Sequence, residues 1–203
     1  MASSSSIRGT NRNITLDRRE VVSRILQDRG DTLLVTGLGA PTWDAAAAGD
    51  HPNSFYLWGG MGGASVCGLG LALAQKKRRV LVITGDGEML MGIGSLATVA
   101  AQRPANLAIC VIDNQRYGET GMQETHTQFG VDLAAMAAGA GFIETDTVWT
   151  MAELEAAMTH LYETPGPVFL DVKVTDAPQP MTLPLRDGPA LKHRFRQTLL
   201  GKA

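Results

Sequence analysis

Two nearly uninterrupted apolar runs constrain the fold of this chain more than any other feature. The first lies within residues 79–84 and the second within residues 106–112. Such runs are typical of strands that lie in a parallel sheet and are buried on both faces. Gly85-Asp86-Gly87 follows the first run, and Asp113-Asn114 follows the second. Because ligands collect beyond the carboxyl ends of parallel strands, we expect Asp86 and Asn114 to emerge side by side at a ligand site.

The remaining sequence alternates between strand and helix patterns. This alternation predicts an α/β fold, a three-layer sandwich with a mainly parallel central sheet. Asp132 is placed to cap one expected helix, and Thr150 with Glu153 forms a capping box at the start of another. We expect helices over 17–29, 64–75, 89–102, 132–140 and 150–162, a further helix beginning near Pro41, and strands over 31–36, 55–58, 79–84, 106–112, 141–144 and 167–174.

Composition excludes several classes of partner. The 203 residues are 44% hydrophobic and 19% charged, with a net charge of -2 at pH 7. A near-neutral balance predicts no nucleic-acid partner, and the absence of a long apolar run predicts no membrane partner. Cys67 and Cys110 both stand among apolar residues, so we expect buried reduced thiols, which favour a cytoplasmic location.

The residue types at the two strand ends favour a metal site. A carboxylate from Asp86 and an amide oxygen from Asn114 are hard donors of the kind that Mg2+ prefers, and a bound diphosphate would supply further oxygens. Gly-Asp-Gly alone is a common turn, so the spacing to Asn114 and the flanking strands carry the prediction. Two further glycine motifs precede expected helices, at residues 58–63 and 36–39, where close backbone approach or anion binding is favoured.

Together these motifs resemble the signature of the thiamine-dependent 2-oxoacid decarboxylases and carboligases. The resemblance implies a thiamine diphosphate-binding fold whose cofactors are thiamine diphosphate and Mg2+, with Asp86, Asn114 and the carbonyl oxygen of Arg116 as metal ligands. It also implies that the Gly59 carbonyl meets the aminopyrimidine and that Met61 lies between the two cofactor rings. The implied cofactor contacts are Gly37, Leu38, Gly59, Gly60, Met61, Gly85, Asp86, Gly87, Glu88, Asn114, Arg116, Tyr117, Gly118 and Thr120.

The long polar loop over residues 113–126 is most similar to the phosphonopyruvate and sulfopyruvate decarboxylase branch of that family. This similarity implies that Tyr117, Gly118 and Thr120 lie near the diphosphate. His126 either faces the mouth of the active site as a catalytic residue or is a solvated loop residue. Glu88 departs from the family pattern, which commonly has a small residue there, so its charge either points away from the diphosphate or contacts a partner.

Thiamine catalysis also requires a carboxylic acid opposite the pyrimidine, which in this family belongs to a separate pyrimidine-binding domain. Glu20, Glu119 and Glu124 stand in the wrong sequence context for that role. The resemblance therefore implies the diphosphate-binding subunit of a split 2-oxoacid decarboxylase, which acts with a pyrimidine-binding alpha-type subunit in a hetero-oligomer, a dimer of dimers or larger. Two alternatives stay open: a carboligase similar to acetolactate synthase, and a noncatalytic cofactor-binding subunit.

Three segments follow from these observations. Residues 1–15 are polar and rich in serine, which predicts a disordered leader, and residues 16–175 form the expected cofactor domain. Residues 176–203 form a tail with four prolines ahead of a short basic helix: Pro178, Pro180, Pro184 and Pro189. We expect this tail to wrap the domain edge or a neighbouring chain.

Overall fold

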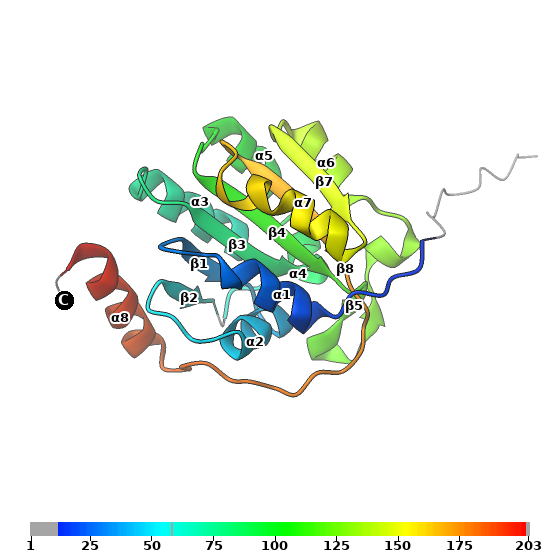
Figure 1. Ribbon diagram of the computed structural model, residues 1–203, viewed down its shortest axis with the longest axis horizontal. Helices are drawn as coiled ribbons and strands as arrows, with labels where there is room; N and C mark the ends of the chain where they lie inside the picture. Colours follow the sequence, from blue (N-terminus) through cyan, green and yellow to red (C-terminus); the bar gives the residue numbers. More distant parts are fainter. Residues whose placement is uncertain (1–11, 58, 202–203) are drawn as a thin grey trace, which may run out of the picture.

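The computed structural model describes residues 12–57 and 59–201 (Figure 1). The expected leader falls mostly outside the described residues, as does Trp58 at the end of the expected strand 55–58. Arg12 lies within the described part and donates from Nη1 to Oε1 of Glu153 at 3.1 Å. None of the described helices has both the length and the apolar character needed to cross a membrane.

A six-stranded parallel sheet forms the centre of the molecule, which confirms the expected fold class (Figure 1). Its strands lie in the order β2-β1-β3-β4-β8-β7. After β1 the chain moves outward to β2 and then crosses back to β3, so the direction of winding changes beside β1. Ligand sites in such sheets lie at this change of direction. The strands are β1 (Leu33–Thr36), β2 (Ser54–Tyr56), β3 (Val80–Gly85), β4 (Leu107–Asp113), β7 (Glu144–Val148) and β8 (Val168–Lys173).

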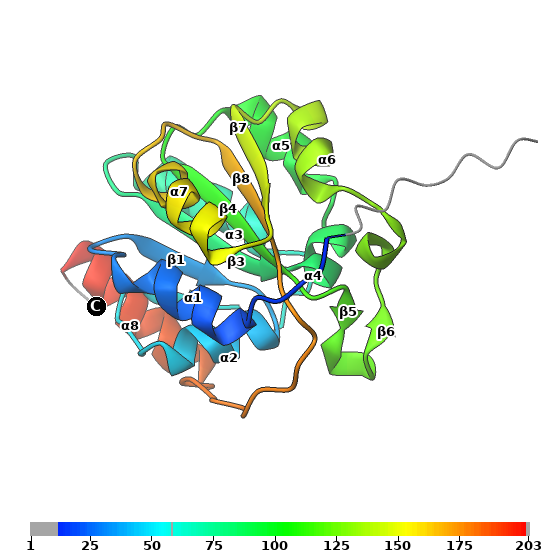
Figure 2. The same cartoon turned by 45° about the vertical axis from the view of Figure 1, so that its right-hand side comes forward.

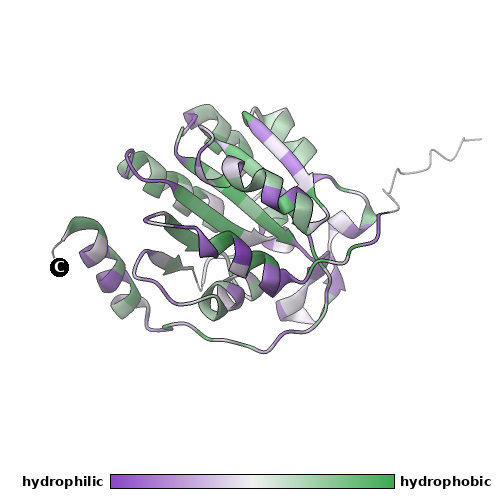
Figure 3. Ribbon diagram, in the orientation of Figure 1, coloured by the Kyte–Doolittle hydropathy of each residue, from purple (hydrophilic) through white to green (hydrophobic). Residues whose placement is uncertain are grey.

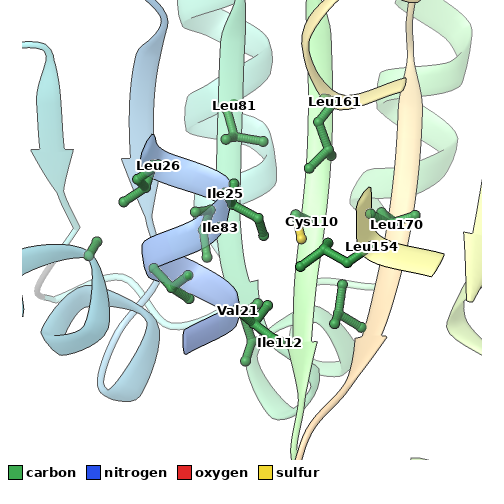
Figure 4. Packing of buried hydrophobic residues seen from close by; sticks show 14 of the residues in the cluster. Val21, Ile25, Leu26, Leu81, Ile83, Cys110, Ile112, Leu154, Leu161 and Leu170 are labelled. Atoms are coloured by element: carbon green, nitrogen blue, oxygen red, sulfur yellow. The ribbon is translucent and has the colours of Figure 1, made fainter. Parts of the chain in front are cut away.

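Helices α1 (Arg18–Gln27), α2 (Ala40–Ala47) and α7 (Met151–Tyr162) cover one face of the sheet. Figure 4 shows Ile25 of α1 and Leu154 of α7 meeting Ile83 and Cys110 of the two central strands. These side chains are fully buried, and a buried aliphatic side chain contributes about 2 kcal/mol to stability. This packing fixes the strands whose ends carry Asp86 and Asn114.

The opposite face is covered by α3 (Ala64–Ala74), α5 (Ser95–Gln102) and α6 (Leu133–Ala140), with the short α4 (Asp86–Met91) at the end of β3. No residue of α3, α5 or α6 is charged. Apart from Gln102 at the end of α5, their exposed positions are apolar or small. Among them, Val66, Leu73 and Met136 are 42%, 40% and 41% exposed. Figure 3 shows the contrast with the charged turns of α1 and α7. The two outer layers therefore differ in chemical character.

Local caps explain where several helices begin. The Asp17 carboxylate accepts hydrogen bonds from the first backbone amides of α1, and Asp132 accepts one from Ala135 of α6. The capping box of Thr150 and Glu153 is present at the start of α7, as the sequence predicted. Each such cap satisfies amides that have no partner within the helix and contributes about 1 kcal/mol.

Two expected elements were wrong. The helix expected over 89–102 is two helices, α4 and α5, because the chain turns at Gly92, where a Cβ atom would lie 2.2 Å from the carbonyl oxygen of Gly62. The strand expected over 141–144 begins only at Glu144. Gly141 has a φ of 105°, in the left-handed region, and it ends α6. Because the chain is still leaving the helix at Gly141, β7 begins later.

The tail runs along the domain edge, as one of the two expected alternatives proposed. Figure 2 shows residues 176–187 crossing from the end of β8 to α8 (Gly188–Leu200). The Phe195 ring of α8 lies 5.4 Å from the Phe55 ring of β2, and Arg194 pairs with Asp50 at 2.6 Å. These contacts hold α8 against the outer strand of the sheet.

The two cysteines differ in exposure. Cys110 lies in the buried core on β4, as expected, whereas Cys67 is exposed on the outer face of α3. The expectation of two buried thiols was wrong for Cys67, because it lies beside the exposed Val66 on the outward side of α3, whereas Ala64 and Leu69 face the core.

Candidate active site

A cavity of about 470 Å³ lies beyond the carboxyl ends of β1, β3 and β4. It is the place where the sequence predicted a ligand site. The cavity is lined by most of the predicted cofactor residues, namely Leu38, Met61, Gly85, Asp86, Gly87, Glu88, Asn114, Arg116, Tyr117, Gly118 and Thr120. Gly37, Gly59 and Gly60 stand in the adjoining loops and do not line it.

Asp86 is the first residue of α4 and is 1% exposed. Its Oδ2 atom accepts hydrogen bonds from the hydroxyls of Thr125, at 2.5 Å, and Thr127, at 3.3 Å. Burial, together with the negative charge of Asp113, raises the pKa of Asp86 to about 7. The two threonine hydroxyls orient the carboxylate. Burial and the negative charge of Asp113 disfavour its ionised form.

Asp113 anchors the loop that follows β4. Its Oδ1 atom accepts from the Thr127 hydroxyl at 2.8 Å and from the backbone amide of Gln115 at 2.9 Å, and its Oδ2 atom accepts from the ammonium group of Lys173. Lys173 also pairs with Asp171 at 2.8 Å. Burial and, to a lesser extent, the negative charge of Asp113 raise the pKa of Asp171 to about 8. This buried network connects β8 to the loop after β4 that begins with Asn114.

Asn114 begins a tight turn toward the small hairpin of β5 (Arg116–Tyr117) and β6 (Gln123–Glu124). Its Oδ1 atom accepts from the backbone amide of Arg116 at 3.0 Å, which orients the amide group. Gln115 holds a φ of 62°, in the left-handed region. The Arg116 guanidinium pairs with Asp176 of the tail at 3.2 Å and with Glu124 at 3.5 Å, so its charge is already engaged by carboxylates.

Tyr117 explains why the second glycine of Gly-Asp-Gly is required. A Cβ atom on Gly87 would lie 2.6 Å from carbon atoms of the Tyr117 ring. The ring therefore packs directly on the backbone of α4 beside Asp86. This contact fixes the hairpin over the start of the helix.

Glu88 is 4% exposed and contacts both glycine loops of its own chain. Its Oε2 atom accepts from the Leu38 amide at 2.9 Å, and its Oε1 atom accepts from the Ala64 amide at 3.3 Å. Burial raises the pKa of Glu88. Of the two expectations for this residue, the structure supports a carboxylate turned toward the loops of the protein.

His126 is exposed at the start of a short 3-10 helix, η2 (His126–Phe129), and does not line the cavity. Thr120 is also exposed, and its hydroxyl pairs with Gln123 at 2.7 Å. Within this chain His126 therefore has the solvated position that the sequence left open. A catalytic role for it stays a prediction.

Several functional residues were missed by sequence reasoning. Thr125 and Thr127 were not predicted because their hydroxyls reach Asp86 only where the loop folds back onto α4. The threonine on each side of His126 is the sequence pattern that could have indicated them. Lys173 was missed because it is brought to Asp113 by strand pairing. The cavity wall also includes Arg18, Trp43, Glu119 and residues 176–179 of the tail.

The donor set fits a magnesium-bound diphosphate. Asp86 supplies a buried carboxylate. Burial and the negative charge of Asp113 disfavour its ionised form, and a bound divalent cation would stabilise that form. Asn114 and the Arg116 carbonyl would add neutral oxygens. Among the described residues no group of three or more histidine, cysteine, aspartate or glutamate side chains could hold a metal by itself. The protein would therefore provide part of the coordination shell and the diphosphate another part.

Comparisons with known proteins identify the family of this chain. Residues 39–172 match the family described as thiamine pyrophosphate enzyme, C-terminal TPP binding domain. The chain is 46% identical over 127 residues to sulfopyruvate decarboxylase subunit beta of Methanothermobacter thermautotrophicus, covering 63% of this chain and 68% of that protein. It is 36% identical over 144 residues to phosphonopyruvate decarboxylase of Streptomyces viridochromogenes, covering 71% of this chain and 36% of that protein.

Solved structures show the same fold. The thiamine diphosphate-dependent 4-hydroxybenzoylformate decarboxylase of Rhodococcus jostii RHA1 aligns with a TM-score of 0.67 at 20% identity, covering 82% of this chain and 34% of that one. The matched residues 39–172 include the ends of β3 and β4, where Asp86 and Asn114 lie. The chain belongs to the family of thiamine pyrophosphate enzymes and carries their C-terminal TPP-binding domain.

Proposed function

We propose that this chain is the diphosphate-binding subunit of a split thiamine diphosphate- and Mg2+-dependent 2-oxoacid decarboxylase, which acts with a separate pyrimidine-binding subunit. The observation that carries the proposal is the buried Asp86 carboxylate beside Asn114 at the carboxyl ends of adjacent strands. The similarity to a protein named as a beta subunit supports the division into two chains.

The residues of this chain would hold and orient the cofactor. Asp86, Asn114 and the Arg116 carbonyl would bind Mg2+, while Met61 would separate the two rings. When bound, thiamine diphosphate supplies the electron sink that decarboxylation of a 2-oxoacid requires. Apolar walls from Leu38, Ile112 and Met122 would exclude water from the reacting carbon.

The acidic side chains that line the cavity all have other contacts or roles, which supports a partner chain as the source of the catalytic acid. Four of its described lining residues are acidic: Asp86, Glu88, Glu119 and Asp176. Asp86 is the proposed metal ligand, and Glu88 is bonded to two loops. Asp176 pairs with Arg116, and Glu119 lies against Gly39, where a Cβ atom would come within 2.5 Å of its Oε1 atom. We therefore assign the acid opposite the pyrimidine to the partner chain.

The substrate is proposed to be a 2-oxoacid with a second anionic group, such as sulfopyruvate or phosphonopyruvate, because the named relatives act on these compounds. Two described lining residues are basic, Arg18 and Arg116, and each pairs with a carboxylate, Asp44 and Asp176 respectively. The cation that recognises the second anion is therefore also expected on the partner.

The experiment that tests this function begins with capture of the tagged chain from its native cells and identification of the copurifying chain by mass spectrometry. The complex is then supplied with sulfopyruvate, phosphonopyruvate or pyruvate, and release of CO2 and the aldehyde product is measured. We expect release to require thiamine diphosphate and Mg2+. Asp86→Ala should weaken cofactor binding more than about hundredfold, because a direct ligand matters more than the residues behind it.

Three outcomes would contradict the proposal. Near-normal cofactor affinity in Asp86→Ala would refute the metal site. A condensation product in place of the aldehyde would show a carboligase, and a complex whose activity survives Asp86→Ala would show a noncatalytic chain. A Glu163→Ala variant is the matched control, because Glu163 is exposed at the end of α7 and away from the cavity.

A further inference from the structure

Glu88 connects two loops that lie far apart in the sequence. One carboxylate oxygen accepts from the Leu38 amide at 2.9 Å, and the other accepts from the Ala64 amide at 3.3 Å. Leu38 belongs to the turn after β1, and Ala64 is the first residue of α3. A single side chain therefore bonds to both glycine loops of the cofactor cavity.

The two helices that follow these loops lack side-chain caps of their own. Neither α2 nor α3 receives a hydrogen bond from its own N-cap side chain, since glycine occupies both positions. Glu88 satisfies the first amide of α3 from another element of the fold, which is the role that a capping side chain normally performs. The start of α3 is thus held by α4.

Close packing confirms that these loops are fitted to α4. A Cβ atom on Gly37 would lie 1.7 Å from Oε2 of Glu88, and one on Gly92 would lie 2.2 Å from the Gly62 carbonyl oxygen. Both glycines are therefore required by the approach of the loops to α4 and its end. The same helix begins with Asp86, so one six-residue element links the metal ligand to both loops.

A direct contact between Glu88 and the cofactor is disfavoured. The diphosphate is anionic, and a carboxylate facing it would repel it. Both carboxylate oxygens are already directed at backbone amides, and the residue is 4% exposed. The Glu88 carboxylate therefore binds the loops, and the diphosphate would be contacted by the metal ion instead.

We propose that Glu88 is a positioning residue, which fixes the Leu38 turn and the start of α3 relative to Asp86 so that the loops match the bound cofactor. This inference rests on the proposed function for the identity of the ligand. The bonds between Glu88 and the two loops are a property of the chain itself and are measurable without any ligand.

The first measurement is hydrogen exchange of the ligand-free chain, followed in peptides that contain Leu38 and Ala64. Glu88→Ala removes both acceptors, so exchange in both loops should accelerate about fivefold, the effect of losing a helix cap. Glu88→Gln keeps one acceptor oxygen and should accelerate one loop more than the other. A peptide from β4 should exchange at the wild-type rate, and Glu163→Ala should leave all peptides unchanged.

The second measurement is titration of the complex between this chain and its partner, which holds both halves of the proposed site. The titrants are Mg2+ with either thiamine diphosphate or inorganic pyrophosphate. Glu88→Gln should weaken thiamine diphosphate about tenfold but change pyrophosphate affinity less than about threefold, because the loops beyond the diphosphate lose their alignment. If Glu88→Ala does not fold, Glu88→Gln carries the test, since the two side chains have nearly the same shape.

Three results would overturn the inference. Unchanged exchange in both loops would show that Glu88 does not hold them. Unchanged thiamine diphosphate affinity would show that holding them is irrelevant to the cofactor. Tighter pyrophosphate binding in Glu88→Gln would show that the carboxylate faces the anion. A wild-type complex that binds neither ligand would refute the proposed function instead, while the exchange data on the chain would still report on the loops.

Discussion

Acid should weaken Mg2+-dependent cofactor binding through the protonation of Asp86. Its pKa is raised to about 7 by burial and by Asp113, so above pH 7 the carboxylate is ionised and below pH 7 it is protonated. A metal ligand must be deprotonated, so each pH unit below 7 should reduce the apparent affinity about tenfold. Between pH 8 and pH 5 this group alone should account for a loss of about hundredfold.

The assay is a fluorescence or calorimetric titration of thiamine diphosphate at fixed Mg2+ from pH 5 to pH 8. The diphosphate and the buried Asp171 also titrate in this range, so the same series is measured with Asp86→Asn, in which these other protonations remain. The difference between the two series isolates Asp86. Parallel pH profiles for the two proteins would refute the reasoning.

The same raised pKa has a consequence for stability with the opposite sign. Because the folded pKa of Asp86 lies above the ordinary value of 3.8, the ligand-free fold loses stability as the pH rises from about 4 to about 7. Asp86→Asn should therefore raise the stability of the ligand-free chain at pH 8 by about 1 kcal/mol and have little effect near pH 4. Urea unfolding at the two pH values measures this, and equal effects at both would contradict it.

Three further changes probe the site and the packing of α8. Thr125→Val removes a 2.5 Å hydrogen bond to Asp86 and should weaken Mg2+-dependent binding about tenfold in the same titration; unchanged affinity would deny the hydroxyl its orienting role. Met61→Ala should keep cofactor affinity but lower turnover of the complex about tenfold, because the side chain shapes the bound cofactor; unchanged turnover would exclude that role. Phe195→Ala removes the ring contact with Phe55 and should destabilise the chain by about 3 kcal/mol in urea unfolding, whereas a loss below 1 kcal/mol would mean that α8 is held mainly by other contacts.

The main elements of the site were predictable because they depend on local sequence. The apolar runs of β3 and β4 identified buried parallel strands, and the polar residues directly after them identified Asp86 and Asn114. Caps at Asp132 and Thr150 located helix starts for the same reason. These features need only a few consecutive residues to take effect.

The remaining features depend on contacts between distant segments. The division of residues 89–102 into two helices is required by the approach of Gly92 to Gly62, which no local pattern encodes. The destination of Glu88 likewise became evident only when the two loops were brought to α4. Lys173 reaches Asp113 because the two residues are paired in the register of β4 and β8. This contact could not be predicted without knowing that the two strands are neighbours.

The uncharged outer faces of α3, α5 and α6 have a consequence for which substitutions the protein can accept. Exposed positions normally tolerate lysine or glutamate, because the surface gains solubility and loses little packing. Large exposed apolar areas usually mark contact surfaces, and these three helices contain no charged residue. In a library of variants selected for activity in the native cells, we expect charged substitutions to be accepted on the solvent side of α7 and rejected at Gly70, Ala101 and Met136.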